Sequence, residues 1–192
     1  MVKACDAKAA LEIGTYFAGT TRVLAEAACY IGAVVVTIDA SGDRAPIVEK
    51  IVATWPEELR DLTTFVPHLS SMFFEMFERT RSFKFEVLFV DRDHSYRGAL
   101  FDLINCANYA QPNAVIVVDD YDLPPVFSAA QDFLALNPEW RELSGAYDQA
   151  ISSDPFTGMR PSVDGLPFLV LIGPSAASVG VRPTNFSLGE LA

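Results

Sequence analysis

The feature that most constrains the fold is an alternation of two apolar patterns along most of the chain. Short apolar runs such as residues 33–39 (AVVVTID) are followed by longer stretches whose apolar residues recur at helical spacing. This alternation is typical of a doubly wound α/β sheet, mostly parallel, with helices on both faces. We expect about seven strands, the last antiparallel, at 9–13, 33–39, 62–66, 85–91, 114–120, 142–149 and 166–173. Helices are expected at 20–30, 45–55, 96–109 and 126–136, with one more after residue 67.

Two of the expected helices have an apolar stripe that should face the sheet. The stripe of the helix at 45–55 consists of Ile47, Ile51 and Trp55, and that of the helix after residue 67 consists of Met72, Phe73, Met76 and Phe77. Both stripes predict core packing rather than a binding surface.

Length and charge restrict the kinds of function. The chain has 192 residues, which suits one domain, and its longest apolar runs are shorter than the ~20 residues of a membrane-spanning helix. The first ten residues lack the apolar core of a signal peptide, so we expect a cytoplasmic protein. The formal net charge of −11 disfavours nucleic acid and favours a small-molecule partner.

Acidic residues stand at the ends of several expected strands. Ligands of open parallel sheets bind beyond the carboxyl ends of the strands, where the loops and helix amino termini meet. The residues expected at this edge are Glu12, Gly14, Asp39, Asp91, Asp93, Asp119 and Asp120. Any one of these acids could instead cap the following helix, but their shared position favours a site.

The turn after the first expected strand, LEIGTYFAGTT (11–21), indicates the kind of ligand. It has the glycine spacing of a triphosphate loop, but Thr20 stands where that loop needs lysine. Tyr16 occupies the second glycine of the dinucleotide fingerprint and would obstruct a pyrophosphate. Asp39 lies where it can accept both hydroxyls of a ribose. Together with the acid Glu12, this combination suits a positively charged nucleoside.

These segments resemble a known enzyme family. LEIGTYFAGTT and TIDAS (37–41) resemble the first two motifs of class I S-adenosylmethionine-dependent methyltransferases, whose glycine turn reads E-x-G-x-x-x-G. VDRDHSYRGALFDL (90–103) and VIVVDDYD (115–122) resemble the D-G-D-H-S-Y and D-D-Y segments of methyltransferase-24 and macrocin-type O-methyltransferases. We expect a Rossmann-like domain over 1–173 and, because no sustained periodicity continues past Gly173, a tail over 174–192 that is extended or partly disordered. The resemblance, which covers roughly residues 9–135, implies S-adenosylmethionine as cofactor. The cofactor-binding residues that it implies are Glu12, Gly14, Thr15, Tyr16, Gly19, Asp39, Ala40, Ser70 and Asp91.

The resemblance also implies metal-assisted O-methylation of a small-molecule hydroxyl. Asp91, Asp119 and Asp120 match the ligand positions of metal-dependent relatives and offer the hard oxygens that Mg²⁺ prefers. Relatives place a general base two or three residues after the first ligand, which is Asp93 or His94 here, and the sequence does not choose between them.

The chain departs from these relatives at several points, which keeps other functions open. Arg92 replaces the glycine of D-G-D-H-S-Y, and PHLSS (67–71) keeps Ser70 for the adenine but lacks the aspartate of the usual G-D-S. Asn113 stands in a turn usually made by glycine. With few residues before the first strand, a substrate lid would come from 152–165, from the tail or from a partner subunit in a homo-oligomer. The alternatives are an inactive S-adenosylmethionine-binding protein, a cephalosporin-hydroxylase-like metal enzyme and a P-loop nucleotidase.

Overall fold

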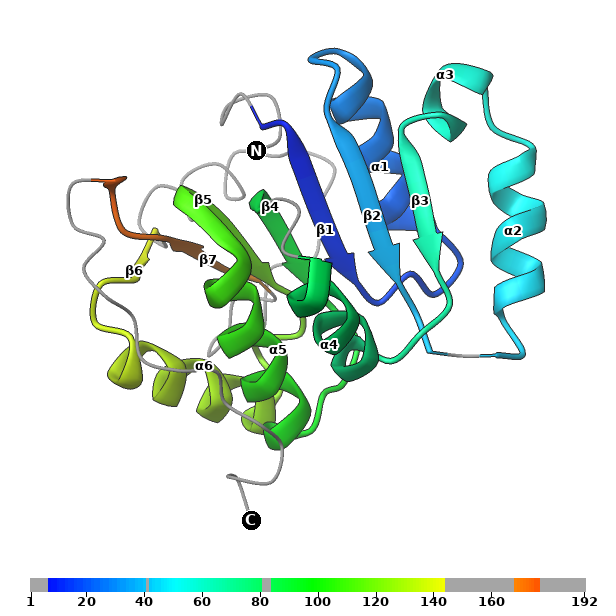
Figure 1. Cartoon of the computed structure of the whole chain (residues 1–192). Coiled ribbons are helices and arrows are strands. Elements are labelled where there is room, and N and C mark those ends of the chain that lie inside the picture. The colour runs from blue at the N-terminus through cyan, green and yellow to red at the C-terminus, as the bar shows by residue number, and fades with distance from the viewer. Residues whose placement is uncertain (1–6, 41, 81–83, 144–167, 177–192) are drawn as a thin grey trace, which may run out of the picture.

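In a computed structural model, residues 7–40, 42–80, 84–143 and 168–176 are described, and they form a seven-stranded sheet with helices on both sides (Figure 1). The strand order is β3-β2-β1-β4-β5-β7-β6. The first five strands pair in parallel, whereas β7 is antiparallel to β5 and to β6. The strands are β1 (Ala9–Ile13), β2 (Val34–Ile38), β3 (Thr63–Val66), β4 (Phe85–Val90), β5 (Ala110–Val118), β6 (Arg141–Glu142) and β7 (Leu169–Ile172). The predicted α/β class and antiparallel end are confirmed.

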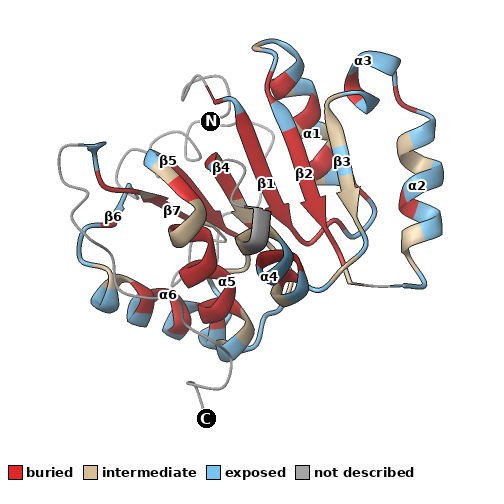
Figure 2. Ribbon diagram, viewed as in Figure 1, coloured by how far each residue is buried: buried red, intermediate tan, exposed pale blue. Residues whose placement is uncertain are grey.

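The side chains of the strands alternate between two cores, as the two-residue period of a strand requires. In β1, Leu11 and Ile13 face the larger core, while Ala10 faces the opposite side. Nearly every strand residue of the central sheet is buried (Figure 2). The larger core holds residues of α4 (Ser70–Thr80), α5 (Tyr96–Tyr109) and α6 (Pro124–Leu136), and the opposite face packs against α1 (Gly19–Cys29), α2 (Ala45–Ala53) and α3 (Glu57–Arg60).

Helix α5 is buried along most of its length because it lies between the sheet and α6. All nine residues from Ala99 to Ala107 are buried, including the polar pair Asp102 and Asn105. Asn105 is satisfied locally, since its Nδ2 donates to the carbonyl of Phe101 at 2.8 Å. Asp102 instead hydrogen-bonds to the side chain of Ser70, the first residue of α4.

Several expectations about the helices and strands are corrected. Ile47 is exposed, and Val48 takes its place in the core because α2 presents a neighbouring face. Met72 and Met76 are also exposed, whereas Phe73 and Phe74 face inward. Strand β5 begins at Ala110 rather than 114 and contains Asn113 with φ 60°, the left-handed conformation expected there.

The carboxyl-terminal part of the chain is described only in pieces. The strand expected at 142–149 is observed as Arg141–Glu142, and residues 144–149 lie outside the described part, as does the expected loop at 152–165. The carbonyl of Pro174 accepts a hydrogen bond from Asn113 N at 2.9 Å, so Pro174, which the sequence placed in the tail, is tied to β5. Residues 177–192 of the expected tail are likewise not described. Within the described residues, no helix is both long enough and apolar enough to cross a membrane.

Candidate active site

The site is organised by the turn after β1, at the point where the sheet changes its direction of winding. Gly14 has φ 110°, and its amide donates to the carbonyl of Ile38 at 2.9 Å. A Cβ on Gly14 would lie 1.8 Å from the backbone oxygen of Asp91. The ends of β1 and β4 therefore meet backbone against backbone, which only glycine allows.

A buried chain of hydroxyl groups supports this turn from below. Thr21 and Thr37 each donate to Glu12 Oε2 at 2.5 Å, and Thr15 Oγ1 lies 2.6 Å from Thr37 Oγ1. Burial raises the pKa of Glu12 to about 7, and nearby negative charges add to this, although the two threonine hydrogen bonds oppose it. The structure thus places the side chains of Glu12 and Thr15 beneath the turn, where they join β1, β2 and α1, rather than at the exposed edge.

Two further residues of the turn have left-handed backbone. Tyr16 has φ 46° and Ala18 has φ 59°, which costs an L-residue about 1–2 kcal/mol. Gly19, in contrast, is the first residue of α1, and a Cβ there would have no neighbour within 4 Å. The space beside Gly19 is open, and its contact with the cofactor stays a prediction, while the residues of the turn with left-handed backbone are Tyr16 and Ala18.

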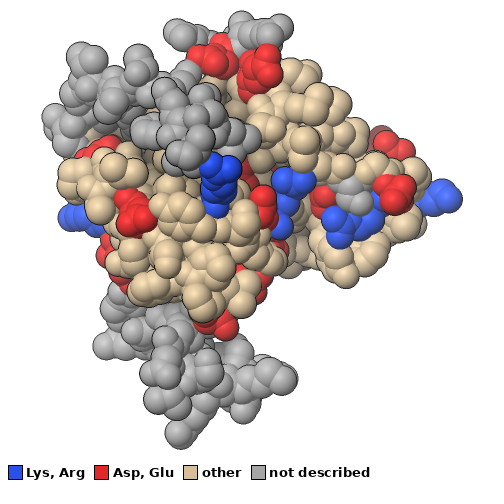
Figure 3. Space-filling model, turned by 90° about the horizontal axis from the view of Figure 1, so that it is seen from below, with Lys and Arg blue, Asp and Glu red and all other residues tan. Residues whose placement is uncertain are grey.

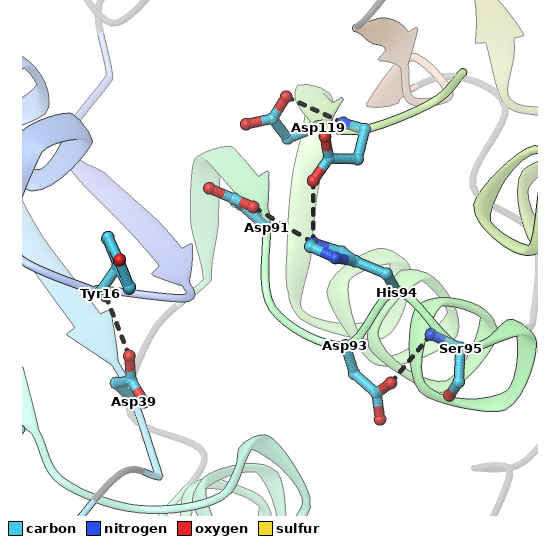
Figure 4. Close-up of polar contacts among 8 residues, drawn as sticks. Tyr16, Asp39, Asp91, Asp93, His94, Ser95 and Asp119 are labelled. Atoms are coloured by element: carbon cyan, nitrogen blue, oxygen red, sulfur yellow. Dashed lines mark hydrogen bonds and ion pairs between the residues drawn. The ribbon is translucent and has the colours of Figure 1, made fainter. Parts of the chain in front are cut away.

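Asp39 connects the ends of β1 and β2. Its Oδ2 accepts a hydrogen bond from Tyr16 N at 2.9 Å (Figure 4), and Arg44 Nη2 lies 3.6 Å from its Oδ1. The Arg44 guanidinium also lies over the Tyr16 ring, 5.1 Å from its centroid. Asp39 is thus positioned by the glycine turn itself, while the neighbouring Ala40, also predicted to bind cofactor, is half-buried.

Four side chains from the ends of β4 and β5 come together at the same edge. His94 Nε2 lies 2.9 Å from Asp120 Oδ2 and 3.6 Å from Asp91 Oδ1 (Figure 4). Potential ligand atoms of these three residues all lie within 4.8 Å of one another. Asp119 lies beside them, and its Oδ1 accepts a hydrogen bond from Asp120 N at 2.8 Å. The predicted ligands Asp91, Asp119 and Asp120 therefore do converge, and His94 joins them.

The electrostatics of this cluster favour binding of a cation. Partial burial and the neighbouring Asp119 charge raise the pKa of Asp91 to about 6, although His94 opposes the shift. Burial likewise raises the pKa of Asp119. Like charges held this close disfavour full ionisation of the carboxyl groups, and a bound cation would relieve the repulsion.

Asp93 points away from this cluster. Its Oδ1 accepts a hydrogen bond from Ser95 N at 2.9 Å, just before α5 begins, as Figure 4 shows. A Cβ at Gly98 would lie 2.1 Å from Asp93 Cγ, so this glycine makes room for the carboxylate. Of the two candidate bases, only His94 is directed toward the converging acids.

The last predicted cofactor residue, Ser70, lies in a separate cavity between the first turns of α4 and α5. This cavity has a volume of about 220 Å³, and its lining includes Ser70, Arg92, Asp93 and Asp102. The sequence analysis does not single out Asp102, although an acidic residue among the apolar residues of a helix can indicate a carboxylate that lines a buried site. The serine side chain is 5% exposed and hydrogen-bonds to Asp102.

The edge is not purely acidic. Seen from the carboxyl ends of the strands, Lys or Arg side chains alternate with Asp or Glu side chains over this face (Figure 3). Arg44 stands beside Asp39, and Arg92 acts electrostatically on Asp102. Chemically, the arrangement offers a carboxylate that could accept hydrogen bonds from ribose hydroxyls, a cluster of carboxylate oxygens beside an imidazole, and a small polar cavity.

Comparisons with known proteins agree with this geometry. Residues 11–121 match the profile of a family described as a methyltransferase domain, methyltransferase-24. No curated protein matches the chain. One similar solved structure is an O-methyltransferase from Bacillus cereus in complex with S-adenosylhomocysteine, with 20% identity, a TM-score of 0.65, and 90% of this chain and 76% of that chain covered. Another is the O-methyltransferase TomG from Streptomyces achromogenes, involved in tomaymycin synthesis and in complex with S-adenosylmethionine, with 17% identity, a TM-score of 0.67, and 91% and 76% covered.

At these identities the likeness to solved structures shows a shared fold. The family profile, however, covers more than half of the chain, including the second half of β1, all of β4 and β5, and Asp120 just after β5. The chain therefore belongs to the methyltransferase-24 family of class I S-adenosylmethionine-dependent methyltransferase domains.

Proposed function

We propose that this protein transfers the methyl group of S-adenosylmethionine to a hydroxyl group of a small molecule, with help from a divalent cation. The observation that carries the proposal is the convergence of Asp91, His94 and Asp120 next to the glycine turn of β1. A net charge of −11 favours a small acceptor over a nucleic acid.

The cofactor would bind across the ends of β1 and β2. The backbone from Gly14 to Tyr16 would face its methionine part, and the Asp39 carboxylate would accept the ribose hydroxyls. Because Tyr16 N already fixes Asp39 Oδ2 at 2.9 Å, the glycine turn and the ribose acceptor form one unit. The base of the nucleoside would enter the cavity beside Ser70.

The carboxylates of Asp91, Asp119 and Asp120 would hold the cation, because carboxylate oxygens are the hard ligands that divalent cations prefer. The pKa values of Asp91 and Asp119 are raised. When bound, a divalent cation lowers the pKa of a coordinated hydroxyl and fixes its position. Asp120, whose φ is 53°, directs its carboxylate toward His94 through this unusual backbone.

The acceptor must also lose its hydroxyl proton during transfer, and His94 is the group placed to take it. Imidazole is the side chain that most often serves as a general base in enzymes. Its Nε2 lies 2.9 Å from Asp120 Oδ2, so the carboxylate can accept from Nε2, orient the ring and stabilise the imidazolium that forms when Nδ1 takes the proton. Asp93 is engaged with Ser95 N and would position the loop instead.

The test combines cofactor binding with turnover. The purified protein is titrated with S-adenosylhomocysteine by calorimetry, and is then incubated with S-adenosylmethionine and a panel of hydroxylated aromatics and sugars, with Mg²⁺, with Mn²⁺ or with a chelator. We expect binding, methylated product and loss of product with chelator. Binding without turnover would indicate an inactive cofactor-binding protein, and iron-dependent oxygen consumption would indicate a hydroxylase.

A further inference from the structure

The cavity between α4 and α5 has the size of a compartment for part of a ligand. Its volume of about 220 Å³ is below the ~300–1,000 Å³ of pockets for whole drug-sized ligands, so it suits one planar ring system. Ser70 begins α4, and Arg92 and Asp93 belong to the loop that also carries Asp91 and His94. A nucleoside at Asp39 with its base in this cavity would therefore keep its other end near the reacting groups.

Asp102 lines this cavity from the middle of α5. The residue is only 1% exposed, and its Oδ1 has no hydrogen-bond partner among the described residues, while its side chain hydrogen-bonds to Ser70. A buried acceptor without a donor is costly, and such groups in native proteins are normally satisfied by a partner. Burial raises the pKa of Asp102 to about 7, and the Ser70 hydrogen bond and the charge of Arg92 counteract this shift. The cavity therefore contains an acceptor that lacks a donor.

The geometry points to Asp102 as the residue that reads the purine base of the cofactor, with Oδ1 accepting a hydrogen bond from the 6-amino group of adenine. This inference rests on the proposed function. Ser70 hydrogen-bonds to the carboxyl group, and Oδ1 is the oxygen that is left without a partner for the ligand to satisfy. A 6-oxo purine would place a carbonyl oxygen against this acceptor and is rejected, because it has no donor there.

The test compares ligands that differ only in the base. Calorimetry measures the binding of S-adenosylhomocysteine, of its 6-oxo analogue S-inosylhomocysteine, and of its 7-deaza analogue, which retains the 6-amino group. For the wild-type protein we expect the 6-oxo analogue to bind at least about tenfold more weakly, and the 7-deaza analogue to bind within about threefold of S-adenosylhomocysteine.

The variant Asp102→Asn keeps the shape of the side chain but can turn its amide to donate to a 6-oxo group. We expect the preference for the 6-amino ligand to fall to within about threefold in this variant. Asp132→Asn on α6, whose carboxylate accepts a hydrogen bond from Tyr96 instead of lining the cavity, is the matched control and should keep the wild-type preference.

The outcomes separate this inference from the proposed function. If wild-type protein binds S-adenosylhomocysteine but does not distinguish the 6-oxo analogue, or if Asp102→Asn keeps the full preference, Asp102 does not read the base while cofactor binding stands. If neither ligand binds, both proposals fail. Should Asp102→Asn not fold, the wild-type comparison of the 6-oxo and 7-deaza analogues still decides the question.

Discussion

A Cβ on Gly14 would lie 1.8 Å from the backbone oxygen of Asp91, so the first strand and the loop that carries Asp91 and His94 are in direct backbone contact. Replacing Gly14 with alanine adds a methyl group that has no space and forces an L-residue to φ 110°. We expect Gly14→Ala to lose more than about 4 kcal/mol of the free energy of unfolding. Urea denaturation followed by circular dichroism measures this loss, or shows that no cooperative transition remains.

Gly19→Ala is the matched control for this substitution, since a Cβ at Gly19 meets no atom within 4 Å and the residue is already helical. It should change the free energy of unfolding by less than about 1 kcal/mol, in the stabilising direction. Equal losses at the two glycines would contradict the close contact described for Gly14.

Glu12 should make the stability of the protein depend on pH. Its pKa is raised by burial from 4.5 to about 7, so the folded protein holds a proton that the unfolded chain releases between these values. The stabilising effect of this proton is complete below pH 4.5 and is lost as the pH rises toward 7. The glutamine of the Glu12→Gln variant cannot ionise, so the variant keeps its stability as the pH rises from 4.5 toward 7. Over this pH range we expect the unfolding free energy of the variant to gain up to about 3 kcal/mol relative to that of the wild type.

Denaturation curves of both proteins from pH 4.5 to pH 8 measure this shift. Asp102 titrates in the same window, but it is present in both proteins and its contribution cancels in the difference. Asp91 is also present in both, but its charge acts on Glu12, so the measured shift includes this coupling. Parallel stability curves would show that Glu12 is ionised in the folded state.

Asp39→Asn tests the proposed ribose acceptor without removing its structural hydrogen bond. The asparagine oxygen can still accept from Tyr16 N, while the negative charge that strengthens hydrogen bonds to ribose is lost. We expect about tenfold or greater weakening of S-adenosylhomocysteine binding, measured by calorimetry, with only a small loss of thermal stability from the weakened ion pair with the partly exposed Arg44. Unchanged affinity would place the ribose elsewhere.

Measurements of kcat for two variants distinguish the two candidate bases, His94 and Asp93. His94→Asn removes the imidazole beside Asp120 and should lower kcat by about 10²-fold or more at saturating cofactor. Asp93→Asn retains an oxygen that accepts from Ser95 N and should leave kcat within about threefold. Rates with an acceptor found in the substrate panel measure both effects, and the reverse order would exchange the roles proposed for His94 and Asp93.

The sequence predicts those parts of the molecule that depend on local pattern. Apolar runs locate the central strands, and the rule that ligands bind at their carboxyl ends brings Asp39, Asp91 and Asp120 to one edge, as observed. The direction of each side chain is not available from such a rule. Glu12 ends the same type of strand as Asp91, yet its carboxyl group lies within the core because the alternating faces of β1 direct it to Thr21 and Thr37.

The choice between neighbours in a loop depends on hydrogen bonds that no motif specifies. Asp93 is directed away from the acids by Ser95 N, and His94 is left to face Asp120. Asp102 was missed for a related reason, since its importance arises only when α4 brings Ser70 against α5. Hydrogen bonds that no motif specifies therefore account for both misses, one of them local, at Ser95, and the other between distant segments, at Ser70 and Asp102.

The backbone contact at Gly14 bears on how related chains should be read. The carbonyl oxygen of Asp91 fills the volume that a side-chain methyl group at position 14 would need. Selection for folding alone is therefore sufficient to retain this glycine, whether or not a related protein is an active enzyme. A degenerate paralogue would keep it as faithfully as an active one. If His94 and Asp120 have the proposed roles, loss of activity will instead be recorded at these two residues, since the exposed His94 and the half-buried Asp120 serve no comparable architectural need.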